Sequence, residues 1–387
     1  MDNISFLVGL KNNLEYSQKF YENTRLFYPD VEIVFVSYDS IDGTNEWLDS
    51  LQDDDLKVFH SKESKSLSDT YNKAIEISTK DYVCFLHNDM VLGNNFLNSI
   101  SEALKKHKLV YYKTIEPPIF GKDERLWKEV KDFGDSFETF DYAAFYDYEE
   151  NQKNKNGEFT DNVSFFLACR KEIITNIGGL DPLFSPMFCE DDDLILRLKL
   201  AGERMFVNPN AVTYHFVSKT SRFSEEFKNK TKQIENNSQR NFVRKWGFYN
   251  YSNARAKYDI GIVLKNGTPE ILSEIEPLAT VTYVDFDFKD YLEKEQSNTL
   301  LSLDDRIKDI INFKKHDVLV RIDGNKVNTK TEKILNNLSD IITQKVQWKE
   351  YKLSGLKVIF QKIFKSYKPI ITIEVGDRLE RNLIVKK

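Results

Sequence analysis

The sequence predicts an α/β protein with a Rossmann-like, mainly parallel sheet. Short apolar runs rich in Val, Ile and Phe alternate with segments of helical spacing from the start of the chain, which is the pattern of βαβ units. The length of 387 residues exceeds one ordinary domain, and a fresh strand pattern begins beyond about residue 255. We therefore expect a first domain over residues 1–252 and a smaller α/β accessory domain, of unknown role, over residues 253–387.

Alternating strands and helices open the first domain. The run Asp42-Gly43-Thr44 predicts a tight turn into a helix, and Ser68 or Asp69 is expected to cap the next helix. Such a layout is typical of nucleotide-binding domains. The expected strands are Ile4–Leu10, Val31–Tyr38, Leu56–His60 and Tyr82–His87, and the expected helices are Leu14–Phe27, Thr44–Leu51 and Ser68–Ser78.

The rest of the chain continues the alternation. An aromatic and acidic stretch, 133–148, precedes a polar segment, 149–157, in which we expect a mobile loop. The aromatic rings either stack on ligand rings or pack beneath the sheet. The run VSFFLACR then predicts a strand leading into a helix. Further on we expect strands at Arg204–Val207, Ala211–Phe216, Asp259–Leu264, Thr280–Phe286 and Asp317–Ile322, and helices at Glu225–Lys245, Pro269–Glu274, Leu303–Phe313 and Thr331–Gln344.

Composition excludes several classes of protein. The formal net charge is -6 and the first two thirds of the chain carry no basic stripe, so we expect no nucleic-acid partner. Cys84, Cys169 and Cys189 lack CxxC spacing, which favours free thiols in a reducing compartment. No apolar run is long enough for a membrane span, and the N-terminus lacks the features of a signal peptide. We therefore expect a cytoplasmic protein.

The segment 352–368 mixes Lys with apolar residues, a composition compatible with contact with an anionic membrane. Packing of this segment on its own domain is the favoured alternative. We accordingly expect no membrane contact. The sequence does not define the oligomeric state.

A polar cluster follows the strand Tyr82–His87, which is expected to be central. His87, Asn88 and Asp89 lie where that strand ends, and ligands of open α/β sheets gather outside the carboxyl ends of the strands. The carboxylate of Asp89 suits Mg²⁺ or Mn²⁺. The alternative is that Asp89 is a turn or cap residue.

Two more groups carry chemistry. Glu190, Asp191, Asp192 and Asp193 open a predicted helix, and four carboxylates are more than helix capping requires. One of them is expected to cap the helix, and a partly buried one to act as a general base. His215 lies in the run VTYHF, where it is either a hydrogen-bonded structural residue or a ligand of a Mn²⁺-class ion.

Three stretches of the sequence resemble, in order, the motifs of family 2 glycosyltransferases with the GT-A fold. They are VSYDSIDGT, NKAIEISTKDYVCFLHNDM and FFLACRKEIITNIGGLDPLFSPMFCEDDDLILRLKLAGERMFVNPNAVTYHF. The resemblance covers about residues 1–250, and its second half is the more specific. There the order and spacing match at Arg170, Gly178-Gly179-Leu180-Asp181, Glu190-Asp191, Asp193-Leu194, Arg197, Gly202, Pro209, Ala211 and His215.

The resemblance implies roles for individual residues. Asp89 is expected to be the metal-binding aspartate of the DXD-type motif, and His215 a further metal ligand. Asp191 is expected to be the catalytic base, with Glu190 in the acceptor site. Gly178 and Gly179 are expected to line the floor near the transferred sugar.

The sequence departs from the family pattern in two places. His87 replaces the usual first acidic residue of the DXD triplet, so we expect it, with Asn88, to contact the donor ribose or the metal. Ser37-Tyr38 replaces the usual pair of aspartates after the second strand. Asp39 lies one place along, where it either contacts the nucleotide or serves as a turn residue.

The implied reaction is the transfer of a sugar from a nucleotide-sugar donor to the hydroxyl of a glycan or other acceptor. It uses Mn²⁺ or Mg²⁺ and inverts the anomeric centre. One alternative is a nucleotidyltransferase. Such an enzyme needs basic, glycine-rich phosphate contacts near the first strand, and Gly9-Leu10-Lys11 matches that requirement poorly. The other is a sugar-binding relative without catalysis, which has no use for a base at Asp191.

Overall fold

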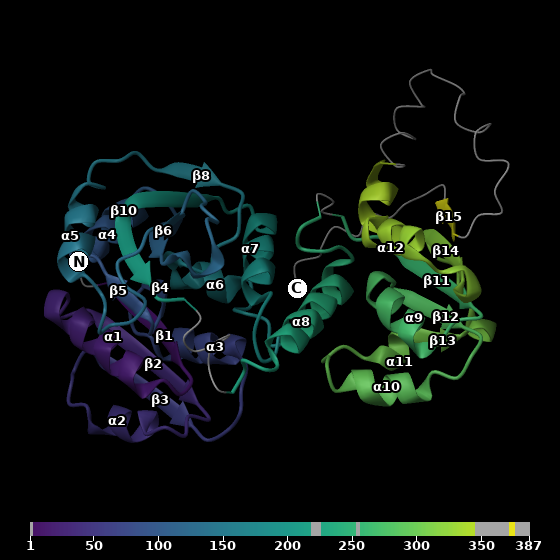
Figure 1. Ribbon diagram of the computed structural model, residues 1–387, viewed down its shortest axis with the longest axis horizontal. Helices are drawn as coiled ribbons and strands as arrows, with labels where there is room; N and C mark the ends of the chain where they lie inside the picture. The colour runs from purple at the N-terminus through teal and green to yellow at the C-terminus, as the bar shows by residue number, and fades with distance from the viewer. Residues whose placement is uncertain (1–2, 218–225, 253–255, 345–370, 376–387) are drawn as a thin grey trace, which may run out of the picture. The chain divides into compact units, whose positions relative to one another are not determined.

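The computed structural model describes residues 3–217, 226–252, 256–344 and 371–375. By its internal contacts the chain divides into two compact units, Met1–Glu235 and Asn236–Lys387. Each unit has a sheet with helices around it (Figure 1), which confirms the predicted α/β class. The segment 352–368 lies outside the described residues.

The sheet of the first unit has the order β3-β2-β1-β4-β9-β6-β10-β5. Its strands are β1 (Ile4–Leu10), β2 (Glu32–Tyr38), β3 (Leu56–Ser61), β4 (Tyr82–His87), β5 (Met90–Leu92), β6 (Leu109–Glu116), β9 (Leu167–Arg170) and β10 (Met205–His215); β7 (Lys128–Val130) pairs with β6 and β8 (Glu158–Thr160) with β10. The pairs β1–β2, β1–β4, β2–β3 and β6–β10 are parallel. Strand β9 is antiparallel to both β4 and β6, so β1, β4, β6 and β10 all end at the same edge of the sheet.

Helices cover both faces of this sheet because apolar side chains alternate along its strands. Phe6 and Val8 of β1 join one apolar core, and Leu7 joins the other. The first core includes residues of α1 (Leu14–Phe27), α2 (Thr44–Ser50) and α4 (Phe96–Leu104); the second includes residues of α3 (Leu67–Ile77), α6 (Lys171–Asn176) and α7 (Glu190–Leu200). A smaller aromatic core contains residues of α5 (Tyr142–Glu150). Most rings of the stretch 133–148 therefore pack rather than stack on a ligand.

Several local predictions need correction. Ser66 caps α3, because its side chain accepts the backbone N–H of Asp69, whose carboxylate in turn accepts the N–H of Ser66. The two strands expected over 204–216 form the single strand β10, in which an irregularity between Asn208 and Val212 accommodates Pro209. Strand β6 and helix α4 were not predicted.

Part of the expected loop 149–157 is also ordered. Helix α5 ends at Glu150, and the buried Glu149 accepts the backbone N–H groups of Asn94 and Asn95. This carboxylate satisfies donors at the start of α4, which would otherwise lack partners there.

The second unit has the sheet order β13-β12-β11-β14-β15. A single apolar core contains residues of these strands and of the surrounding helices. The helix expected over Leu303–Phe313 is instead a short helix, a strand and a 3-10 turn. The elements are β11 (Ile260–Lys265), α9 (Pro269–Ile275), η2 (Glu276–Leu278), β12 (Val281–Val284), α10 (Lys289–Gln296), α11 (Leu303–Arg306), β13 (Ile307–Asp309), η3 (Ile310–Asn312), β14 (Val318–Asp323), η4 (Gly324–Lys326), α12 (Thr329–Asn336) and β15 (Ile371–Val375), the last antiparallel to β14.

Helix α8 (Thr231–Trp246) contains the division between the units. Its later turns pack within the second unit, where the buried Arg244 pairs with Glu276 at 2.7 Å. For this reason the division precedes the expected boundary after residue 252.

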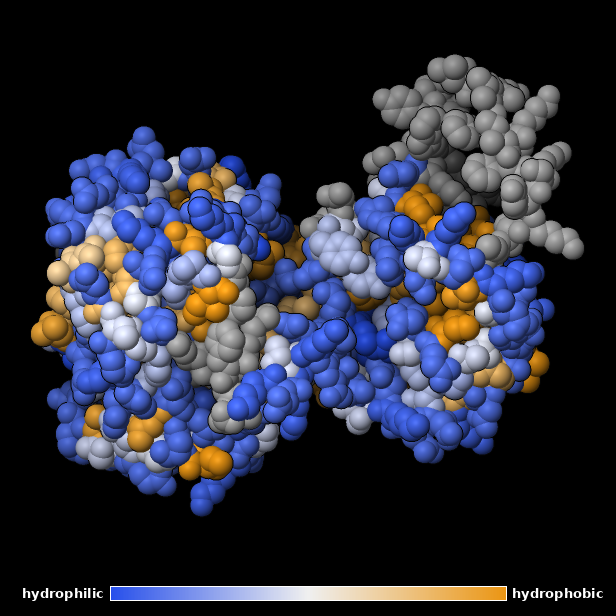
Figure 2. Space-filling model, in the orientation of Figure 1, coloured by the Kyte–Doolittle hydropathy of each residue, from blue (hydrophilic) through white to orange (hydrophobic). Residues whose placement is uncertain are grey.

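The visible surface of both units is largely hydrophilic, with apolar side chains in small scattered groups (Figure 2). Among the described residues, no helix combines the length and apolar character that crossing a bilayer requires.

Candidate metal and catalytic site

A cavity of about 430 Å³ opens at the edge where β1, β4 and β10 end. It lies wholly within the first unit. Its polar lining includes residues that follow two different strands and residues that begin α7. These are His87, Asn88, Asp89, His215, Glu190 and Asp191. The structure therefore brings together most of the residues that the sequence singles out.

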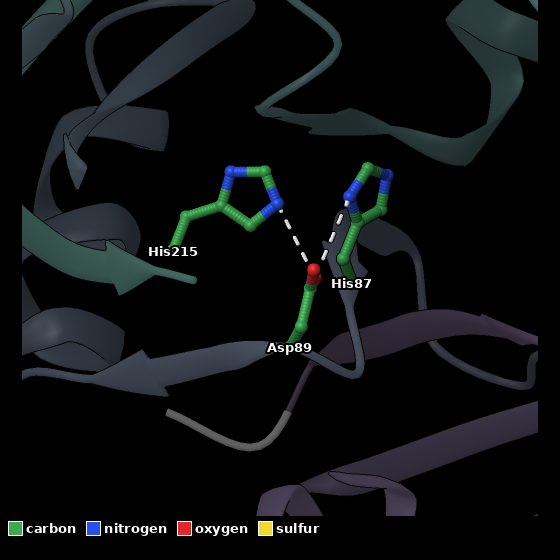
Figure 3. Close-up of side chains that lie close together, drawn as sticks. All are labelled: His87, Asp89 and His215. Atoms are coloured by element: carbon green, nitrogen blue, oxygen red, sulfur yellow. Dashed lines mark ion pairs between the residues drawn. The ribbon is translucent and has the colours of Figure 1, made fainter. Parts of the chain in front are cut away.

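Two of the predicted residues, Asp89 and His215, face each other in this cavity, and His87 joins them (Figure 3). The Oδ1 atom of Asp89 lies 3.2 Å from Nε2 of His215 and 4.0 Å from Nδ1 of His87. Potential ligand atoms of the three residues all lie within 4.8 Å of one another. His87 thus stands where a metal ligand would, beside the two residues assigned to that role.

The spacing and the chemistry of these atoms fit a divalent cation. Ligand atoms about 2.1 Å from an octahedral ion are about 3 Å apart when adjacent and about 4.2 Å apart when opposite. The separations of 3.2 Å and 4.0 Å fall within this range. Two imidazole nitrogens and one carboxylate oxygen suit first-row ions such as Mn²⁺ and leave positions for further oxygen ligands.

The electrostatics of the cluster favour positive charge between its carboxylates. Burial lowers the pKa of His215, but attraction to Asp89 and Glu116 outweighs burial and raises the pKa to about 10. Burial and the neighbouring His215 lower the pKa of His87 to about 4. A positive charge is therefore stabilised beside Asp89, and a bound cation can supply that charge in place of a proton on Nε2 of His215.

Two features of this site were missed in the sequence. Glu116, whose Oε1 lies 3.2 Å from Nδ1 of His215, ends the unpredicted strand β6. The apolar run LVYYKTI followed by an acid is the same signal that identified Asp89. Phe165 and Phe166 stand just before β9, and their rings lie 5.5 Å and 5.2 Å from that of His87. Only the antiparallel direction of β9 places them at this edge.

The four carboxylates of α7 have different surroundings. Cys189, with φ of 64°, is the N-cap residue and makes no side-chain cap, so the expected carboxylate cap is absent here. Glu190 and Asp191 line the cavity. Burial raises the pKa of both carboxyls, and the negative charge of the next residue in the run raises it further. Both are therefore better proton acceptors than ordinary carboxylates.

Asp193 and Arg197, which match the family motif, have a structural role. They form an ion pair at 2.7 Å, and Nη1 of Arg197 donates to the carbonyl of Gly179 at 2.7 Å. A Cβ atom at Gly179 would lie 2.4 Å from the side-chain oxygen of Asn72. Gly178 and Gly179 both have positive φ, and neither is among the cavity-lining residues. Their surroundings among the described residues indicate a turn anchored on α3 and α7.

The remaining predicted contacts lie near the cavity. Asn88 lines it, and its side-chain amide donates to Ser17 Oγ at 3.0 Å. Asp39 pairs with Lys11 at 2.8 Å. Lys11 lines the cavity and Asp39 is not among the lining residues, so the aspartate contacts the site through the lysine that it pairs with.

Comparisons with known proteins identify a family that part of the chain matches. Residues 5–178 match the sequence profile described as Glycosyl transferase family 2. No curated protein matches the chain. Among solved structures, S. aureus TarS is similar at 16% identity over 56% of this chain and 60% of its own, with a TM-score of 0.41.

Two other structures are similar to the same extent. GalNAc-T7 with UDP, GalNAc and Mn²⁺ shares 11% identity over 55% of this chain and 43% of its own, with a TM-score of 0.43. The mannosyltransferase PcManGT of Pyrobaculum calidifontis, in complex with GDP-Man and Mn²⁺, shares 17% identity over 56% of this chain and 58% of its own, with a TM-score of 0.40. The chain spans less than two thirds of these three structures. Residues 5–178, which include the end of β4 with Asp89, match glycosyl transferase family 2. Over this part of the chain the match confirms the resemblance seen in the motifs.

Proposed function

We propose that the first unit transfers a sugar from a nucleotide-sugar donor to an acceptor hydroxyl, with a divalent cation, Mn²⁺ or Mg²⁺, and with inversion of the anomeric centre. The proposal is carried by one observation. A set of cation ligands and a pair of carboxylates with raised pKa line the same cavity in a domain of this family.

His87, Asp89 and His215 would hold the cation. A bound divalent cation supplies positive charge to the diphosphate of the donor as that group departs. These three residues come from the ends of β4 and β10, so the sheet itself fixes their spacing. The acceptor would occupy the part of the cavity that lies between these residues and the start of α7, which both line it.

Asp191 would act as the general base. It accepts the proton of the acceptor hydroxyl while the acceptor oxygen forms its bond to the anomeric carbon. The bond from that carbon to the diphosphate breaks at the same time, and the diphosphate leaves with the electron pair. A single displacement of this kind inverts the anomeric centre and requires no covalent nucleophile on the protein.

Glu190 would bind the acceptor. Its side chain is 7% exposed, and its Oε2 has no hydrogen-bond partner among the residues that the structure describes. A buried carboxylate oxygen without a partner is costly, and an acceptor hydroxyl would supply the missing donor. Glu190 is therefore assigned to acceptor orientation and Asp191 to proton removal.

The test begins with a thermal-shift screen of nucleotide-sugars on the full chain, with and without Mn²⁺. A ligand of the folded state raises its stability with the logarithm of saturation, so the true donor should raise the melting temperature only with the cation. Donor hydrolysis then separates the alternatives. Release of nucleoside diphosphate from the donor supports a transferase. Release of pyrophosphate from a nucleoside triphosphate in the presence of a sugar 1-phosphate indicates a nucleotidyltransferase, and binding of the donor without turnover indicates a sugar-binding relative.

A further inference from the structure

The imidazole of His215 lies between two carboxylates. Its Nε2 is 3.2 Å from Oδ1 of Asp89, and its Nδ1 is 3.2 Å from Oε1 of Glu116. The side chains of the three residues are 14% exposed or less. Both ring nitrogens of this histidine thus have acidic partners, one on the cavity side and one behind it.

The sheet places Glu116 at this position. Strands β6 and β10 pair in parallel with Ile115 opposite Tyr214, so the next residues, Glu116 and His215, leave the sheet side by side. The other oxygen of Glu116 lies 3.6 Å from Nζ of Lys128, on β7. The carboxylate is therefore held from one side while it contacts His215 from the other.

We propose that Glu116 is a positioning residue for the cation site. It accepts a hydrogen bond from Nδ1–H of His215, which keeps the proton on that nitrogen and directs the lone pair of Nε2 toward Asp89 and the cation. Histidine ligands of metals commonly donate their other N–H to a carboxylate, which fixes the tautomer and increases ligand basicity. This inference rests on the cation site of the proposed function.

The geometry separates this role from that of a ligand. Among the described residues, the group that could hold an ion comprises His87, Asp89 and His215, and Glu116 contacts the ring of His215 on the opposite nitrogen. Loss of Glu116 should therefore weaken cation binding without removing any ligand atom.

The experiment uses the full chain and Mn²⁺ alone, titrated by electron paramagnetic resonance. Glu116→Gln should raise the Kd for Mn²⁺ by about 10- to 100-fold, the usual effect of losing such a partner. Glu129→Gln is the matched control. Glu129, on β7, also bonds a lysine, Lys113, and accepts a hydrogen bond from Tyr148 at 2.7 Å. Among the described residues it forms no hydrogen bond with His215, so the Kd of this variant for Mn²⁺ should stay that of the wild type.

A second readout reports the tautomer directly. The chain has 5 histidines, so selective ¹⁵N-histidine labelling gives a simple spectrum of the Zn²⁺-loaded protein. The wild type should show His215 protonated at Nδ1, and Glu116→Gln should lose that preference. Where Glu116→Gln does not fold, Glu116→Asp replaces it and should show a Kd between those of the wild type and a His215→Ala variant.

Three results would overturn the inference. The first is a Kd for Mn²⁺ in Glu116→Gln that equals that of the wild type. The second is a loss of Mn²⁺ affinity in Glu129→Gln as large as that in Glu116→Gln. The third is a wild-type protein that binds no divalent cation. The proposed function fails differently, because intact Mn²⁺ binding with the expected Glu116 effect but no donor turnover would reject the transferase and leave the positioning role standing.

Discussion

The Nε2 atom of His215 lies 3.2 Å from Oδ1 of Asp89, which joins the end of β10 to the end of β4 within one cavity. The two strands are separated in the sheet by β9 and β6. Both nevertheless point the same way, because β9 is antiparallel to each of its neighbours. The side chains that follow parallel strands meet at one edge, and this is where a cation would receive ligands from distant parts of the chain.

Removal of either residue should affect cation-dependent donor binding to different degrees. Asp89→Ala removes the carboxylate that faces both histidines and should abolish that binding. His215→Ala leaves one imidazole and one carboxylate, so it should weaken binding and change the preference among Mn²⁺, Mg²⁺ and Co²⁺. Calorimetric titration of the donor with each cation measures both effects.

His60→Ala is the control for these variants, because His60 pairs with Asp49 at 2.9 Å and is not a cavity-lining residue. Equal losses in the control would indicate a general effect on folding. Unchanged donor binding in Asp89→Ala would remove the assignment of the cation site.

Asp191→Asn should lower turnover by at least about a hundredfold at pH 8, the scale of a lost general base, while leaving donor and Mn²⁺ binding nearly intact. The change keeps the shape of the side chain and removes the proton acceptor. Asp192→Asn is the matched control, one residue along the same helix, and should retain most of the turnover. If Asp191→Asn transfers sugar at a near-normal rate, the base is another residue, with Glu190 the first to examine.

The pH dependence of transfer should reflect the surroundings of Asp191. Burial and then the charge of Asp192 raise the pKa of Asp191 to about 7. A base acts only when ionised, so kcat/KM should fall as the pH drops through this region and stay high above it. Removal of the neighbouring charge in Asp192→Asn should shift the acid limb to lower pH. If the acid limb of the kcat/KM profile stays at the same pH in Asp192→Asn, the assignment of Asp191 as the general base is contradicted.

The sequence predicts strands well where an apolar run ends in polar residues. Strands β1 and β4 have the predicted limits, and the strand-end rule brings Asp89 and His215 to one cavity. Glu116 was missed because β6 was missed, although the same rule applies to it. The direction of β9, which brings Phe166 to the cavity, depends on pairing between strands distant in sequence, and a local pattern does not encode it.

Residues of one motif can have different roles that their spacing in the sequence does not reveal. Asp191 and Asp193 belong to one run of acids, yet only Asp191 lines the cavity, while Asp193 pairs with Arg197. Helical geometry explains the division, because residues two apart point to nearly opposite sides of a helix. One of them therefore faces the cavity and the other faces the turn at Gly179.

Helix α8 provides a test of how the second unit is held together. Arg244 and Glu276 are both fully buried and paired at 2.7 Å, and Arg306 binds the other oxygen of Glu276 at 2.7 Å. Arg244→Met leaves the buried Glu276 with Arg306 and the more distant Arg240, at 3.9 Å, as its remaining positive partners. Breaking a buried pair in this way should cost about 3–5 kcal/mol, seen as faster hydrogen exchange in peptides of β11, β12 and α9.

The matched control for this prediction is Arg321→Met, because Arg321 and Glu374 form a pair with side chains 50% and 56% exposed. Such a pair contributes about 1 kcal/mol or less, so exchange in the same peptides should change little. The Mn²⁺ Kd should be unaffected in both variants, because the cation ligands all belong to the first unit. If Arg244→Met instead weakens Mn²⁺ binding while the second unit keeps its protection, α8 supports the first unit, and the division of the chain within this helix is wrong.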